Sequence, residues 1–224
     1  WLSVVPVAPS AYPIPGRSLS YLSHHLMYQA VGFDAGWFHA GNVALHLTNG
    51  VLLYGVASQM VGPLAAVLAT GLLLVHPLAS SAVAYLTART DLLMTMWILL
   101  ALWMALGQNA VWRRLVMGVA LLAAAMSKEI GLIGLPLVAL TLWHYRRDVP
   151  GARGLMVSAW IVLGIVAGLA WSTLLNWFEM SSNVGGPSVG WPEFLLLRNA
   201  ALWHQMSLWV LPVGFSIDHD VLSV

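Results

Sequence analysis

Long apolar stretches separated by short polar segments constrain the fold of this chain most strongly. They lie at about 37–60, 63–76, 91–107, 115–126, 129–144, 155–177 and 194–213. A helix needs roughly 20 apolar residues to cross a bilayer, and fewer where other helices cover it. Charged residues make up only 8% of the chain and the mean hydropathy is +0.82, which few soluble domains reach. The sequence predicts an all-α polytopic membrane protein, with about six to seven transmembrane or re-entrant helices in one transmembrane domain over residues 1–224.

The remaining composition excludes several classes of protein. The net charge is +1, so the charge balance gives no reason to expect a nucleic-acid partner. The absence of Cys excludes disulfide bonds and thiolate metal sites. Residues 1–11 lack the basic start of a signal peptide, and we expect the natural N-terminus upstream of Trp1.

Arginine clusters predict the orientation of the helices. Arg113 and Arg114 follow the third apolar stretch, and Arg146, Arg147 and Arg153 follow the fifth. Counting crossings puts both clusters on one face, which the positive-inside rule assigns to the cytoplasm. The extracytoplasmic face then collects His24, His25, His39, His76, Arg89, Asp91, Ser127, Lys128, Glu129 and the loop 178–193. We therefore expect any active site on the extracytoplasmic face.

Polar clusters border the apolar stretches at His76-Pro77, Arg89-Thr90-Asp91 and Ser127-Lys128-Glu129. An ionisable group beside a lipid-buried helix is costly, so such groups usually face a cavity, a pathway or a partner. Each cluster also has a structural interpretation. Proline breaks a helix at His76, with a short helix expected over 79–88. Thr90 or Asp91, and likewise Ser127, can cap the helix that follows it.

Arg89 is the residue of these clusters for which a purely structural role is hardest to assign. It lies on the outer face, where positive-inside statistics do not favour an arginine. Its planar guanidinium can bind phosphate through paired donors. The structural alternative is an ion network in which Lys128 and Glu129 pair with Asp91 and Arg89.

A polar stripe runs along the first apolar stretch. His39, Asn42, His46 and Asn49 are spaced by 3, 4 and 3 residues, which places them on one face of a helix. Hydrogen bonding between helices explains such a stripe, and binding of a substrate is the other interpretation. Metal ligation by the two histidines has little support because no carboxylate shares the stripe.

Other polar residues remain open in role. Asp34, between two glycines, fits a turn better than a catalytic base. Glu179 and Glu193 flank the Gly/Ser/Pro-rich loop Ser181–Pro192, which is either a lid or a connector. The stretch 194–213 can cross, re-enter or lie flat, because it contains Arg198, His204 and Gln205. Motifs for ATP or dinucleotide chemistry do not occur.

Several motifs in order resemble one family of membrane glycosyltransferases. Gly16-Arg17-Ser18-Leu19 resembles its "RPL" segment, and Trp37–Asn49 is similar to its "FHxxNxxLHxxN" helix. His76–Leu93 resembles "HPxxxxAVAxxxxRxDLL", Ser127–Gly131 resembles "SKExG", and Leu211–His219 resembles "PxxLxxDH". The family is the GT-C type, O-mannosyltransferase-like, including the transmembrane and tetratricopeptide-repeat-containing group and its bacterial relatives. The resemblance covers about residues 16–220.

The resemblance implies a GT-C-like bundle that transfers a sugar, with inversion, from a polyprenyl-phosphate donor. It places the lead catalytic acid in an outer loop upstream of residue 1, and Ser18 stands where the family has Pro. We expect Arg89 to bind the donor's phosphate with help from Lys128. We expect Asp91 and Glu129 to orient these cations or to hold a divalent cation. The donor site would be lined by His76, His39, Asn42 and His46.

The alternative is a non-catalytic subunit of a larger membrane complex, such as a respiratory or photosynthetic one, that keeps a reduced GT-C-like bundle. The expected partners are then other membrane subunits and the lipid bilayer. Many Trp and Met residues are compatible with broad apolar contacts of that kind. A transporter is disfavoured because no inverted repeat is visible.

Overall fold

The computed structural model describes residues 17–108, 110–145 and 203, and all regular structure in this part is helical. The elements are α1 (Ser18–Val31), α2 (Ala35–Val61), α3 (Pro63–Val75), α4 (Pro77–Ala84), η1 (Leu86–Ala88), α5 (Arg89–Leu106), α6 (Val111–Ser127), η2 (Glu129–Ile133) and α7 (Gly134–Tyr145). The all-α prediction is confirmed for these residues. The expected helices at 155–177 and 194–213 lie outside them.

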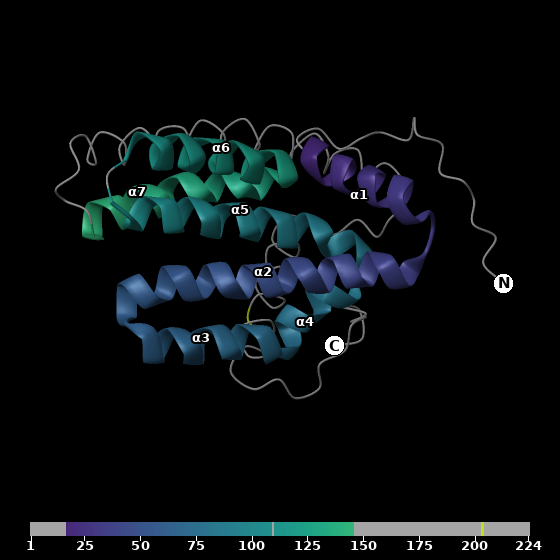
Figure 1. The fold of residues 1–224 in the computed structure, drawn as a ribbon, viewed down its shortest axis with the longest axis horizontal. Coiled ribbons are helices and arrows are strands. Elements are labelled where there is room, and N and C mark those ends of the chain that lie inside the picture. The colour runs from purple at the N-terminus through teal and green to yellow at the C-terminus, as the bar shows by residue number, and fades with distance from the viewer. Residues whose placement is uncertain (1–16, 109, 146–202, 204–224) are drawn as a thin grey trace, which may run out of the picture.

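Helices α2 and α3 form a tight antiparallel hairpin (Figure 1). Asp34 begins α2 by accepting a hydrogen bond from the backbone N–H of Gly36, 2.8 Å away. Gly62 makes the turn with a φ of +85°, a value that glycine adopts at little cost. Pro63 follows at the first position of α3, where its missing N–H leaves no helical bond unmade.

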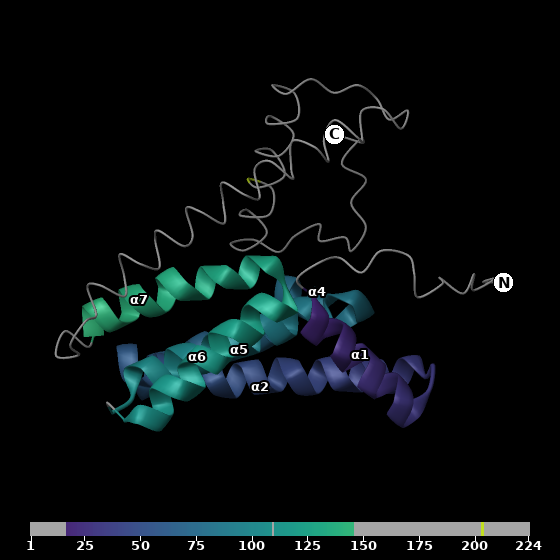
Figure 2. The same ribbon diagram turned by 90° about the horizontal axis from the view of Figure 1, so that it is seen from above.

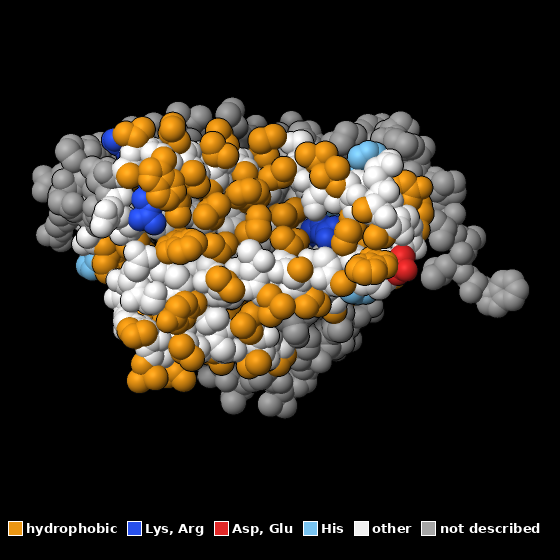
Figure 3. Space-filling view, in the orientation of Figure 1, with side chains coloured by type: hydrophobic (Ala, Val, Ile, Leu, Met, Phe, Trp, Pro, Cys, Tyr) orange, Lys and Arg blue, Asp and Glu red, His pale blue; other side chains and the backbone are white. Residues whose placement is uncertain are grey.

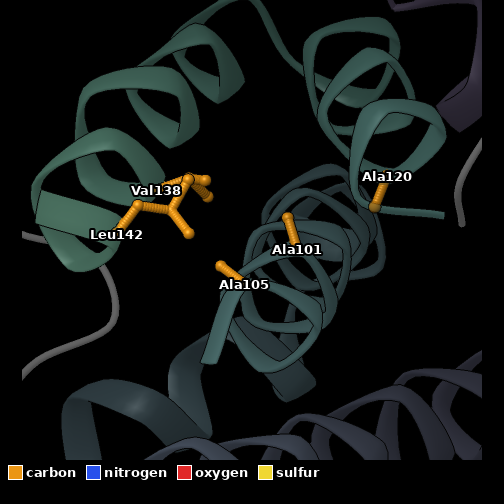
Figure 4. Packing of buried hydrophobic residues seen from close by; sticks show 5 residues of the cluster. All are labelled: Ala101, Ala105, Ala120, Val138 and Leu142. Atoms are coloured by element: carbon orange, nitrogen blue, oxygen red, sulfur yellow. The ribbon is translucent and has the colours of Figure 1, made fainter. Parts of the chain in front are cut away.

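Helix α5 occupies the centre of the bundle, between α2 on one side and α6 and α7 on the other (Figure 2). Its contact with α6 and α7 is made by small residues. Ala101 and Ala105 of α5 meet Ala120 of α6 and Val138 and Leu142 of α7 (Figure 4). Ala101 and Ala120 are completely buried, so these helices approach closely, as helices in membranes commonly do over small residues.

Two helices expose continuous apolar stripes. The α3 stripe consists of Leu64, Val67, Leu68, Leu72 and Val75, and the α6 stripe consists of Val111, Leu115, Val119, Leu122 and Met126. Their spacing places each set on one helical face. Figure 3 shows apolar side chains over much of the described part of one face. Soluble monomers rarely expose apolar surface this continuously, since contact with water is unfavourable.

One helix in the described part has both the length and the apolar character needed to cross a membrane, Leu86–Leu106. The pair Pro63–Val75 and Pro77–Ala84 meets the same criteria only when counted together across its 57° bend. Helix α2 has the length, 27 residues, but contains the polar stripe. A single apolar helix of this length also occurs in the core of soluble proteins, and the described residues form an all-helical bundle.

The expected helices correspond to observed ones with small shifts at their ends. The stretches 37–60, 63–76 and 91–107 correspond to α2, α3 and α5. The stretches 115–126 and 129–144 correspond to α6 and to η2 with α7. The short helix expected over 79–88 is instead α4 followed by η1, and α1 was not expected at all. Helix α1 has only 14 residues, too few to cross a bilayer, and no capping side chain marks its start.

Candidate functional site

Chain direction alternates through the bundle, so the start of α5, the end of α6 and η2 lie at the same end, beside α1 (Figure 1). This end brings together Asp91 and Lys128, which are 37 residues apart in sequence. Lys128 Nζ donates to Asp91 Oδ1 at 2.5 Å. The expected pairing of Lys128 with Asp91 is therefore confirmed.

Glu129 pairs with Arg17 and not with Arg89, so that part of the expected network is wrong. Arg17 Nε donates to Oε2 at 3.0 Å and Nη2 donates to Oε1 at 2.6 Å, a two-point contact. The hydrogen bond from Arg17 lowers the pKa of Glu129 to about 2, and the same bond raises the pKa of Arg17. The sequence did not indicate the pairing of Arg17 with Glu129, because Arg17 directly precedes α1, a helix that was not expected.

Helix α1 is held on this end of the bundle by two further hydrogen bonds. Ser20, which is buried, donates from Oγ to the carbonyl of Ser127 at 2.7 Å. His24 lies with Nε2 3.4 Å from the carbonyl oxygen of Leu86 and Nδ1 2.8 Å from that of Ser20. Helix α1 thereby connects to η1, which directly precedes α5, and to the end of α6.

Arg89 is buried, with only 4% of its surface exposed. Its Nε and Nη1 atoms are buried and have no hydrogen-bond partner within the described residues. Its carbon Cζ lies 5.8 Å from the centre of the Phe38 ring, a cation–π arrangement. Arg89 is thus a buried cation that has no carboxylate partner within the described residues, unlike Arg17 and Lys128.

Each residue of the polar stripe on α2 contacts a backbone carbonyl of a neighbouring element. Asn42 Nδ2 donates to Tyr85 and Asn49 Nδ2 donates to Leu92, both at 3.1 Å. The histidines contact carbonyls at 3.4 Å, from His39 Nδ1 to Val83 and from His46 Nε2 to Leu74. Interhelical hydrogen bonding, one of the two interpretations of the stripe, is therefore confirmed. Binding of substrate by His39, Asn42 and His46 stays a prediction.

The remaining predicted residues occupy different places. His76 is buried at the break between α3 and α4, and its Nδ1 accepts from the N–H of Leu78 at 3.2 Å. His25 is exposed on α1. Asp34 is the turn residue that was expected, because it caps α2. Nothing in these contacts brings His25 or Asp34 to Arg89.

The expected helix caps at Asp91 and Ser127 are wrong. Helix α5 begins at Arg89, after Ala88, which has no polar side chain to cap it; Asp91 pairs with Lys128, and Thr90 Oγ1 donates to the carbonyl of Thr87 at 3.3 Å. Ser127 ends α6, and its hydroxyl donates to the carbonyl of Ala123 at 2.8 Å. Asp91 lies within the first turn of α5 and Ser127 is the last residue of α6, so neither residue occupies the N-cap position of the helix that it was expected to cap.

A divalent cation has no evident protein site in the described part, where no three His, Asp or Glu side chains gather. Asp91 and Glu129 each pair with a cation instead. Several predicted residues lie outside the described residues: Glu179, Glu193, Ser181–Pro192, Arg198, His204, Gln205 and Asp218-His219.

The chemistry of this end of the bundle follows from its charges. Two ion pairs, Arg17–Glu129 and Lys128–Asp91, neutralise four charges, and Arg89 adds one buried cation with unused donors. Such an arrangement can bind an anion. No known protein family, no curated protein and no solved structure matches this chain.

Proposed function

We propose that this chain is a membrane-embedded glycosyltransferase with a GT-C-like bundle, acting on a polyprenyl-phosphate sugar at the extracytoplasmic face. Arg89 binds the phosphate of the donor. The observation that carries the proposal is the burial of Arg89 with Nε and Nη1 unpaired among the described residues. A buried charge without a partner is strongly unfavourable, and an anionic ligand would relieve that cost.

The two ion pairs support the same proposal. Asp91 holds Lys128, and Glu129 holds Arg17, at the end of the bundle where α5 begins. Asp91 therefore orients Lys128, one of the two roles expected for it, whereas Glu129 orients Arg17 and neither Arg89 nor Lys128. Lys128, whose side chain is about one-fifth exposed, adds a second cation at the end of the bundle where α5 begins.

The reaction needs one group that these residues do not supply. An acceptor hydroxyl attacks C1 of the sugar, the bond from C1 to the phosphate oxygen breaks, and the lipid phosphate leaves with the electron pair. A base must take the hydroxyl proton. The pairing of Asp91 and Glu129 with cations makes both carboxylates poor bases. Arg89 stabilises the departing phosphate.

The membrane location is supported by the α3 and α6 stripes. Both present apolar side chains outward over the length of a helix; α6 packs against the candidate span Leu86–Leu106, and α3 packs against α2. With the helices expected at 155–177 and 194–213, the described bundle would form a domain of six to seven transmembrane or re-entrant helices.

A non-catalytic subunit is the second candidate, and one observation favours it. Every described member of the polar stripe, together with Asp91 and Glu129, already has a partner within the chain. A bundle of this kind needs no substrate to satisfy those groups. The exposed apolar stripes would then contact other membrane subunits.

Turnover separates the two candidates. The natural full-length protein is reconstituted in liposomes with a radiolabelled polyprenyl-phosphate sugar, and release or transfer of the sugar is followed. Turnover that falls to background in Arg89→Gln supports the glycosyltransferase. Absence of turnover in the wild type, with purification in a stable complex of other membrane proteins, supports the accessory subunit.

A further inference from the structure

The guanidinium of Arg89 lies against α2, where Gly41 and Phe38 stand almost one helical turn apart. We propose that Gly41 and Phe38 are positioning residues that hold this guanidinium in place with its donors unused. The inference rests on the proposed function for the identity of the anion, and on geometry alone for the placement of Arg89.

Gly41 provides the space. A methyl group at this position would overlap Nη2 of Arg89 and would lie 2.6 Å from Cε of Met27 on α1. Every other residue has a Cβ carbon, so the guanidinium of Arg89 can occupy its observed position only when residue 41 is a glycine. The atoms in conflict are the ends of flexible side chains and not backbone. An alanine here should therefore displace Arg89 and leave the helices in position.

Phe38 provides an attractive surface that accepts no hydrogen bond in the plane of the guanidinium. The ring face attracts the cation, with Cζ 5.8 Å from the ring centre. This differs from Arg17, whose Nε and Nη2 hydrogens are both consumed by Glu129. An aromatic ring and a glycine hold Arg89 while leaving Nε and Nη1 for another acceptor. That is the arrangement a phosphate-binding arginine requires.

The matched control is another helical glycine. Gly118 of α6 has no atom within 4 Å of the position a methyl group would occupy. Gly41→Ala and Gly118→Ala therefore make the same chemical change within a helix, and both gain the helix propensity of alanine. Only Gly41→Ala should disturb Arg89.

The experiment uses the full-length protein in detergent and two readouts. Phenylglyoxal, a reagent for arginine, is applied and modified positions are mapped by mass spectrometry, with exposed Arg114 as the internal reference. We expect Arg89 to be protected in the wild type and in Gly118→Ala, and to react at a rate close to that of Arg114 in Gly41→Ala. Binding of polyprenyl phosphate should weaken roughly tenfold in Gly41→Ala, the loss expected for charge-assisted hydrogen bonds.

The two readouts separate failure of the inference from failure of the proposed function. Continued protection of Arg89 in Gly41→Ala, with unchanged binding, overturns the positioning role. A wild type that does not bind the lipid overturns the proposed function, while the labelling still decides whether Gly41 places Arg89. Should Gly41→Ala fail to fold, Phe38→Leu decides, because it removes the ring face: increased labelling of Arg89 supports the inference, and unchanged protection contradicts it.

Discussion

Arg17 and Glu129, 112 residues apart in sequence, form a two-point ion pair that connects α1 to η2. The pair closes the end of the bundle next to Lys128 and Asp91. With the bond from Ser20 to the carbonyl of Ser127, it joins α1 to η2 and to the end of α6. Helix α1 also places Met27 beside Arg89, because Cε of Met27 and Nη2 of Arg89 both lie close to Gly41.

The Arg17–Glu129 pair predicts a pH dependence of stability. The pKa of Glu129 is about 2 in the folded protein, below the value near 4.3 of an unperturbed Glu. The pair therefore stabilises the fold fully above about pH 4.3, and this contribution is lost as the pH falls towards about 2. Since half of the Glu129 side chain is exposed, the contribution is at most about 1 kcal/mol.

The measurement is the free energy of unfolding in detergent for wild type and Glu129→Gln, at pH 6 and at pH 3. The variant should be less stable at pH 6, and the difference should shrink at pH 3. A difference that is equal at both values would show that the carboxylate charge does not stabilise α1.

The polar stripe predicts unequal effects for two similar substitutions. Asn42→Leu removes a hydrogen bond to Tyr85 and should lower the free energy of unfolding by about 1 kcal/mol. Asn49→Leu should lower the free energy of unfolding by less than Asn42→Leu does. It removes the hydrogen bond to Leu92, but it also removes a buried Oδ1 atom that has no donor within the described residues and is therefore unfavourable. Thermal unfolding of both variants in the same detergent checks the order. A larger loss for Asn49→Leu contradicts the assignment of these bonds.

The contact between α5 and α6 predicts sensitivity to side-chain size. Ala101 is completely buried against these helices, so Ala101→Leu should destabilise the bundle by about 1–3 kcal/mol. Val119→Leu, on the exposed α6 stripe, is the control and should change stability by less than about 0.5 kcal/mol. The two variants are compared by thermal unfolding. Equal stability would mean that the helices do not pack as closely as observed.

Much of the helical layout could be predicted from the sequence, because apolar length and helix breakers are local signals. Helix α2 was expected over 37–60 and runs over Ala35–Val61. The expected pairing of Lys128 with Asp91 also followed, since counting crossings placed both residues at one end. Helix α1 could not be predicted, because its 14 residues owe their place to contacts with α5 and α6.

The details of the site depend on contacts between distant segments, which a sequence does not reveal. Glu129 could not be assigned to Arg17 without knowing that α1 lies beside η2. The burial of Arg89 depends on a glycine and an aromatic ring on another helix. Conversely, Asp91 had the chemistry of a helix cap, but α5 begins two residues before it, and Asp91 pairs with Lys128 from the first turn.

Binding of polyprenyl phosphate tests the central claim most directly. The full-length protein in detergent is titrated with polyprenyl phosphate and, separately, with the uncharged polyprenol. Wild type, Arg89→Gln and Arg113→Gln are compared, because Arg113 also has a buried Nε without a partner within the described residues but stands where α6 begins, at the opposite end of the bundle. We expect wild type and Arg113→Gln to prefer the phosphate, and Arg89→Gln to bind both lipids equally. An unchanged preference in Arg89→Gln would contradict the assignment of Arg89 to the donor's phosphate.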